Sequence, residues 1–134
     1  MAELFLNIRN DLDELSVAAD AATRFLERNK ASSDVIFTAN LAIEEIVTNI
    51  IKYGYEDSSS HEITVRLTLI ESALEIETCD DGKAFNPFSQ PEPDASCAAQ
   101  KVGGLGIHLV RNMLDAYAYE RRNGRNIVKL SKKL

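Results

Sequence analysis

The sequence predicts one α+β domain, a two-layer sandwich in which a mixed, largely antiparallel sheet carries its helices on one face. Two observations support this class. Short runs of alternating apolar and polar residues indicate half-buried strands, and longer segments with apolar residues three or four apart indicate amphipathic helices. The chain has 134 residues, enough for one hydrophobic core, so we expect a single domain over residues 1–134.

The first half of the chain predicts one strand and two helices. Residues 4–8 read as a short strand, and residues 11–29 have apolar side chains at helical spacing. A group of capping residues that begins at Ser32 precedes a second helix, which we expect to run to about residue 53. Gly54 then ends this helix.

The second half predicts the remaining sheet and a long loop. The expected elements are strands at 63–69 and about 74–78, a helix from 105, and strands at 117–122 and 126–131. Asn123-Gly124 between the last two strands is typical of a hairpin turn. Residues 86–102 contain three prolines and no periodicity. A structureless loop of this length is more often a functional lid than a linker, and we interpret it as a lid.

The charge balance limits the kinds of partner. Lys and Arg total 15 against 21 Asp and Glu, which gives a net charge of -6. This excess of acid argues against nucleic acid or an anionic membrane as partner but leaves a single bound nucleotide open. The chain shows no signal peptide and no long apolar run, and Cys79 and Cys97 lack metal or redox spacing, so we expect a cytoplasmic protein with free thiols.

Glu45 and Asn49 form the first candidate site, on the predicted second helix. They are four residues apart, so their side chains are neighbours on one helix face. A carboxylate can accept a proton from an attacking hydroxyl, and an amide oxygen suits Mg²⁺. Taken alone, the same pair fits a solvated helix face.

Asp80 and Gly82 form the second candidate site, directly after a predicted strand. A carboxylate accepts hydrogen bonds, including one from the exocyclic amino group of adenine, and glycine lets the backbone come close to a flat ligand. An ordinary Asp-Gly turn is the alternative.

The third candidate site is the run Gly103-Gly104-Leu105-Gly106-Ile107, at the start of the predicted third helix. Glycines that lead into a helix expose backbone N–H groups to phosphate. A flexible hinge and helix cap is the alternative. A dinucleotide fingerprint is excluded because no strand precedes the run, and a P-loop because Gly-Lys-Ser/Thr is absent.

In this order, the three motifs resemble the Bergerat ATP-binding fold of the GHKL superfamily. The run Leu-Ala-Ile-Glu-Glu-Ile-Val-Thr-Asn at 41–49 is similar to its N box, and Asp-Asp-Gly-Lys-Ala-Phe-Asn-Pro at 80–87 is similar to its first glycine box. Residues 103–106, with Val110-Arg111 and Asp115, are similar to the second. Within the superfamily, the chain most resembles the small anti-sigma factor serine/threonine kinases.

The resemblance implies a role for each matching residue. Glu45 matches the general base, Asn49 the Mg²⁺ ligand and Asp80 the aspartate that reads adenine. The implied ATP-binding residues also include Gly82, Phe85, Gly103, Gly104, Leu105, Gly106 and Ile107. Many members carry Gly-Thr in the last hairpin, where this chain has Arg125-Asn126. Either Asn126 substitutes for the threonine or the contact is missing.

The implied function is Mg²⁺- and ATP-dependent phosphorylation of a serine on a small anti-anti-sigma (STAS) domain. The implied partners are that domain, a sigma factor held by sequestration, and a second copy of the chain in a homodimer. A non-catalytic switch, in which ATP orders the lid and so creates a binding surface, is the alternative. A histidine-directed sensor kinase is disfavoured because its histidine-bearing dimerisation helices are missing.

Overall fold

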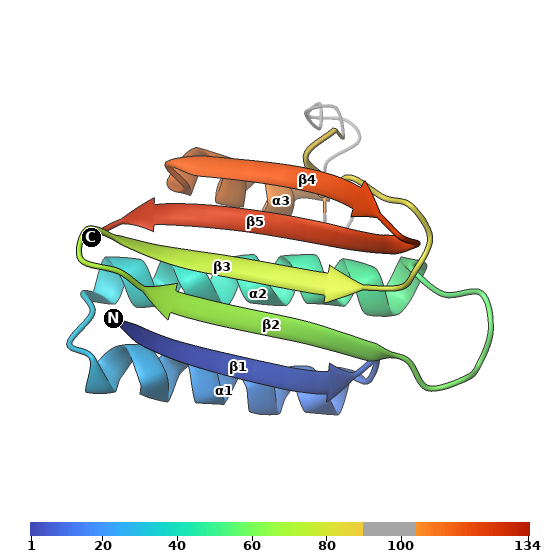
Figure 1. Ribbon diagram of the computed structural model, residues 1–134, viewed down its shortest axis with the longest axis horizontal. Helices are drawn as coiled ribbons and strands as arrows, with labels where there is room; N and C mark the ends of the chain where they lie inside the picture. The colour runs from blue at the N-terminus through green and yellow to red at the C-terminus, as the bar shows by residue number, and fades with distance from the viewer. Residues whose placement is uncertain (90–103) are drawn as a thin grey trace.

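The computed structural model describes residues 1–89 and 104–134, which form a sheet with helices packed on one side of it (Figure 1). The elements in order are β1 (Ala2–Arg9), α1 (Leu12–Arg28), α2 (Ser33–Tyr53), β2 (Glu62–Leu69), β3 (Ala73–Asp80), the 3₁₀ turn η1 (Pro87–Ser89), α3 (Gly104–Met113), β4 (Ala116–Arg122) and β5 (Arg125–Lys133). Each predicted strand and helix is present, and the α+β class is confirmed.

In the described part of the chain, the sheet has five strands in the order β1-β2-β3-β5-β4, and each neighbouring pair is antiparallel. The expectation of a mixed sheet was therefore wrong. β3 and β4 do run in the same direction, because α3 carries the chain back between them (Figure 1). However, β5 lies between these two strands and pairs with both, so they do not form a parallel ladder.

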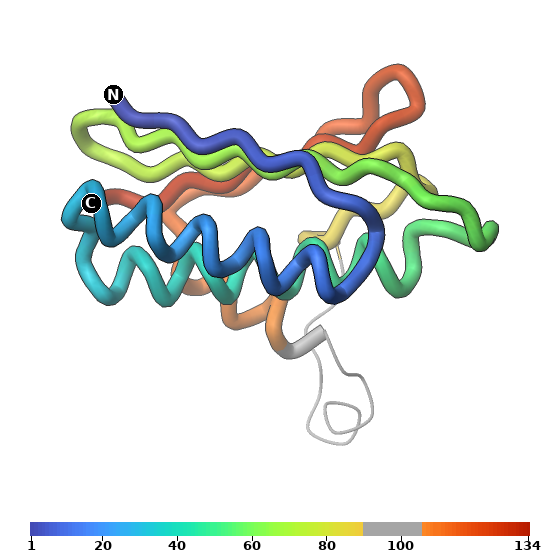
Figure 2. The backbone as a smooth tube through the Cα atoms, turned by 90° about the horizontal axis from the view of Figure 1, so that it is seen from below, coloured from blue at the N-terminus to red at the C-terminus, as the bar shows by residue number. Residues whose placement is uncertain are grey.

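The hydrophobic core lies between the sheet and the helical layer, and Figure 2 shows the two layers edge-on. The alternation of exposed and buried residues along β2 places one set of side chains against the helices and the other on the open face. Fully buried residues from the three main elements of this core include Leu26, Ile43, Ile63 and Leu67. The burial of this apolar surface is what fixes α1 and α2 on the sheet.

Local signals set the ends of α2 and the last hairpin. The Ser32 side chain accepts a hydrogen bond from the Val35 N–H at 3.2 Å and caps the helix. At Gly54, a Cβ would lie 2.5 Å from the Ile50 carbonyl oxygen, so only glycine fits there. Asn123 and Gly124 both have positive φ, 53° and 75°, as a type I′ turn requires.

The first residues of the predicted lid are structured. Pro87–Ser89 form η1, Pro87 is buried, and the Phe88 ring stacks on Tyr117 with centroids 4.4 Å apart. The rest of the predicted lid, and Gly103 after it, lie outside the described residues. Within 1–89 and 104–134, none of the helices has the length and apolar character needed to cross a bilayer.

Candidate nucleotide site

A pocket of about 310 Å³ opens where β3 ends, between the sheet and the C-terminal half of α2. Its lining residues are Ile46, Asn49, Ile50, Tyr53, Gly54, Asp80, Lys83, Ala84, Phe85, Pro87, Asn126 and Val128. They combine apolar walls with a few polar groups, as small-molecule sites do. A wider cleft of about 920 Å³, lined by Met1 and Leu134 at the opposite edge of the sheet, includes none of the predicted site residues.

Asp80 is the buried acid of this pocket, with 2% of its surface exposed. Its Oδ1 atom accepts hydrogen bonds from the Gly82 N–H at 2.9 Å and from Asn126 Nδ2 at 3.0 Å. Burial raises the pKa of Asp80, and these two hydrogen bonds oppose that rise in part. The described residues make no hydrogen bond to the other oxygen, Oδ2, which leaves it as an acceptor for a ligand.

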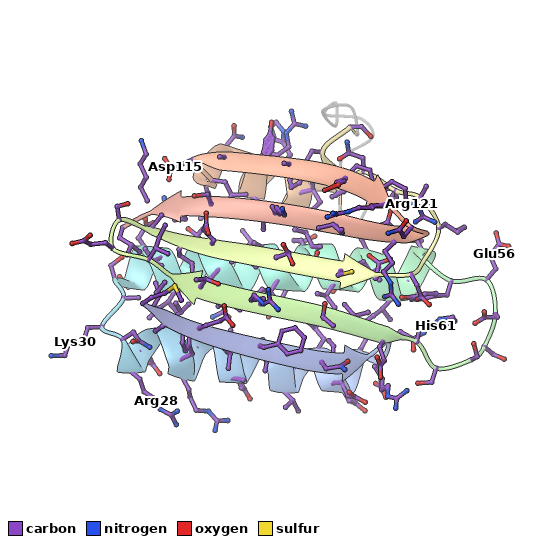
Figure 3. All side chains as sticks on the ribbon, in the orientation of Figure 1. Arg28, Lys30, Glu56, His61, Asp115 and Arg121 are labelled. Atoms are coloured by element: carbon purple, nitrogen blue, oxygen red, sulfur yellow. The ribbon has the colours of Figure 1, made fainter. Side chains whose placement is uncertain are left out.

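Gly82 lies at a close approach between two segments. A Cβ at this position would lie 2.8 Å from the Gly54 carbonyl oxygen and 3.0 Å from Asp80 Oδ1. The same Gly54 carbonyl accepts a hydrogen bond from the Lys83 N–H at 2.8 Å. Arg121, labelled in Figure 3 at this edge of the sheet, donates from Nη1 to the Gly82 carbonyl at 2.8 Å. A larger residue at 82 would separate the end of α2 from the pocket rim.

Asn49 and Glu45 both project from α2, but they reach different surroundings. Asn49 lines the pocket, whereas Glu45, one turn earlier, faces the start of α3. A Cβ on Gly106 would lie 2.0 Å from the carboxyl carbon of Glu45, so the two residues are in close contact. Burial, and secondarily the charge of Glu44, raise the pKa of Glu45. The carboxylate is therefore a better proton acceptor than an ordinary glutamate.

The second glycine segment begins α3. The backbone of Gly104 and Leu105 forms the first turn of this helix, and Gly106 follows against Glu45. The side chain of Ile107 is 3% exposed and belongs to the hydrophobic core, so only its backbone is available for the predicted contact with phosphate. A helix that begins at Gly104 fits both the phosphate-binding interpretation and the helix-cap alternative.

The chemistry of the donor set fits a magnesium nucleotide. In the described part of the chain, no group of three or more His, Cys, Asp or Glu residues could hold a metal ion by itself. Mg²⁺ needs few protein ligands when phosphate oxygens supply others. The Asn49 side-chain oxygen can serve as such a single protein ligand, because Asn49 lines the pocket.

Asn126 is the site residue whose contact the sequence left open, and Tyr119 is a neighbour of it that the motifs did not predict. Asn126 lies opposite Asp80 in the β3–β5 ladder, is buried, and hydrogen-bonds Asp80 directly. The Tyr119 hydroxyl donates to Asn126 Oδ1 at 2.5 Å. Asn126 therefore makes the supporting contact with the site that the sequence left open. Only the register of β5 against β3 would have predicted it.

His61, labelled in Figure 3, makes contacts that hold the loop between α2 and β2 in place. Its Nε2 lies 2.8 Å from Asp57 Oδ1, and its Nδ1 lies 3.3 Å from Asp81 Oδ1. Its ring stacks on Tyr55 with centroids 4.1 Å apart. The hydrogen bond to Asp57 is the main cause that raises the pKa of His61. These contacts connect the loop to Asp81, the residue after Asp80.

Comparison with known proteins identifies the class that this fold and site define. The chain belongs to the histidine kinase-like ATPase domain family, whose model matches residues 8–132. The resemblance seen in the motifs is thereby confirmed.

The individual proteins that the chain is similar to include two protein kinases. The chain is 28% identical to the serine/threonine-protein kinase BtrW of Bordetella bronchiseptica, over 94% of this chain and 95% of BtrW. It is also 28% identical to the serine-protein kinase RsbW of Bacillus velezensis, over 68% of this chain but only 61% of that protein.

Two solved structures share the fold. The RsbU and RsbW domains of Rv1364c from Mycobacterium tuberculosis superpose with a TM-score of 0.72 at 15% identity, covering all of this chain and 33% of that one. The SiaB–SiaC complex from Pseudomonas aeruginosa gives a TM-score of 0.60 at 13% identity, covering 98% of this chain and 89% of that one.

Proposed function

We propose that this chain is an Mg²⁺- and ATP-dependent serine/threonine-protein kinase that phosphorylates a serine of a small anti-anti-sigma (STAS) partner and also sequesters a sigma factor. The observation that carries the proposal is the arrangement along α2. Asn49 faces the pocket of the buried Asp80, and Glu45 lies one turn away against the start of α3. The names of BtrW and RsbW as protein kinases support the same activity.

The pocket residues hold and orient the nucleotide. Asp80 Oδ2 accepts a hydrogen bond from the adenine amino group, and Phe85 and Ile50 line the walls for the flat base. The backbone N–H groups of residues 104–107, at the start of α3, would bind the phosphates. Asn49 would hold Mg²⁺, which would neutralise the charge that develops in phosphoryl transfer.

Glu45 acts as the general base. Its carboxylate accepts the proton of the substrate serine hydroxyl as the serine oxygen bonds to the γ-phosphorus. The bond from that phosphorus to the β–γ bridging oxygen breaks, and ADP leaves with the electron pair. Because the pKa of Glu45 is raised, this proton transfer is more favourable than it would be to an exposed glutamate.

The test is transfer of labelled phosphate to candidate STAS domains, together with ATP titration. Glu45→Gln should leave ATP binding nearly intact and slow transfer by roughly 10²–10⁴-fold, the usual contribution of a positioned base. Glu27→Gln, the same change at an exposed position on α1, is the control. Asn49→Ala should weaken Mg²⁺·ATP binding itself, whereas Asn7→Ala, at an exposed position of β1, should not.

The same experiment separates the kinase from the switch. If the wild type binds ATP and captures its partner but transfers no phosphate, the kinase proposal is wrong and the non-catalytic switch replaces it. If neither Glu45→Gln nor Asn49→Ala changes binding or transfer, these two residues of α2 take no part in the activity. The proposal includes a cytoplasmic homodimer, as in the small kinases that the motifs resemble, and sedimentation measures that oligomeric state.

A further inference from the structure

We propose that Asn126 is a positioning and specificity residue, which orients the Asp80 carboxylate so that one oxygen is reserved for the amino group of adenine. The inference rests on the proposed function only in that the pocket binds an adenine nucleotide. It does not depend on phosphate transfer.

The hydrogen bonds of Asn126 fix which way its amide points. Its Nδ2 donates to Asp80 Oδ1 at 3.0 Å and to the Lys83 carbonyl at 2.8 Å. Its Oδ1 accepts from the Tyr119 hydroxyl at 2.5 Å and from the Phe85 N–H at 3.2 Å. If the amide were turned over, its oxygen would face two acceptors and its NH₂ group would face a backbone N–H. The observed orientation is therefore the only one that satisfies the network.

This network decides which oxygen of Asp80 is free. The N–H of Gly82 and the amide of Asn126 both donate to Oδ1, and no described residue donates to Oδ2. The Asn126 bond is the largest influence that opposes the effect of burial on the pKa of Asp80. Without that bond, the buried carboxyl is more easily protonated, and a protonated Oδ2 would donate a hydrogen bond instead of accepting one.

Asn126 also connects the acid to the rim of the pocket. Through Lys83 and Phe85 it binds the segment that follows Gly82, and both of these residues line the pocket. A threonine or serine hydroxyl has a single hydrogen to donate, so it cannot bond Asp80 and Lys83 at once. The asparagine therefore does more at this position than a hydroxyl can.

The test compares ADP and GDP binding by calorimetry, because guanine has a carbonyl oxygen where adenine has its amino group. Asn126→Ala should weaken ADP binding about 10–150-fold, the range for a lost hydrogen bond to a charged group, and should weaken GDP binding much less. The ratio of the two affinities therefore falls. Circular dichroism checks that the variant is folded.

Asn126→Asp should make ADP binding depend on pH, which a residue with only a structural role would not do. It places two carboxyl groups about 3 Å apart, and such a pair cannot be fully ionised. At pH 8 we expect ADP binding to be weak. At pH 5.5 a proton shared between the new acid and Asp80 Oδ1 restores the bond and leaves Oδ2 as acceptor, so ADP binding recovers toward the wild-type value at that pH.

A milder pair of variants keeps the proposal testable if the changes at Asn126 prevent folding. Tyr119→Phe removes one donor to Asn126 and should lower the ADP to GDP ratio about 2–12-fold, as expected for one ordinary hydrogen bond. Tyr117→Phe is the matched control. Its residue lies on the same face of β4, where its ring stacks on Phe88, and the ratio should not change.

Three results would overturn the proposal. The first is an unchanged ADP to GDP ratio in folded Asn126→Ala and Asn126→Asp. The second is an equal loss of both nucleotides without pH recovery, which marks a structural role only. The third is a wild type that binds no ADP, which also removes the proposed nucleotide site. A wild type that binds ADP but transfers no phosphate refutes the kinase alone.

Discussion

Asp80→Asn should separate the stability of the fold from the binding of nucleotide. Asp80 is 2% exposed, and burial is the main cause that raises its pKa. An acid with a raised pKa binds protons more tightly in the folded chain, so its charged form lowers the free energy of unfolding at neutral pH. This lowering of the free energy of unfolding disappears as the pH falls through the folded-state pKa of Asp80. Asparagine is neutral and keeps an oxygen for Gly82 and Asn126, so we expect a nucleotide-free Tm at least as high as that of the wild type.

The same substitution should weaken nucleotide binding. It places an N–H group opposite the adenine amino group, where Oδ2 accepted. A hydrogen bond to a charged group is worth about 1.5–3 kcal/mol, which corresponds to about 10–150-fold in Kd. Calorimetric titration with ADP measures the affinity, and thermal unfolding without nucleotide measures the stability.

Asp81→Asn is the matched control for this pair of measurements. It removes the same charge from the next residue, whose side chain is exposed and contacts His61 outside the pocket. We expect its ADP affinity to stay near the wild-type value. An unchanged Kd in Asp80→Asn would show that Asp80 does not read the base. A lower Tm in Asp80→Asn would show that the charged carboxylate stabilises the fold, contrary to the reasoning from burial.

Three further predictions concern the neighbouring groups. Gly106→Ala should push the Glu45 carboxylate aside, since the new Cβ would lie 2.0 Å from its carboxyl carbon. Phosphate transfer should fall while ADP affinity is kept. Equal transfer rates in the variant and the wild type would contradict this. Phosphate transfer should decrease as the pH falls through the raised pKa of Glu45. Glu44→Gln should move this decrease to lower pH, because it removes a charge that raises the pKa of Glu45. The pH–rate profiles of the wild type and of Glu44→Gln test this. Asp57→Asn should lower the pKa of His61, and an NMR titration measures this. In the wild type, the contact between the His61 imidazolium and Asp57 is present below the raised pKa and is lost as the pH rises through it. An unchanged titration would mean that the two side chains do not interact in solution.

The sequence by itself determined the elements and most of the candidate site, because these depend on neighbours along the chain. Helical periodicity, with a cap at Ser32 and glycine at 54, placed Glu45 and Asn49 on one face of α2. Alternation of apolar residues placed the strands, and Asn123-Gly124 set the turn of the last hairpin because both residues accept positive φ.

Only the tertiary structure decided how those elements meet. It made the sheet wholly antiparallel by inserting β5 between β3 and β4, which no local pattern specifies. The resulting register sets Asn126 opposite Asp80, and the packing of α3 on α2 brings Gly106 against Glu45. Such contacts join residues far apart in the chain, and they form only when burial of the common core fixes strand order and helix position.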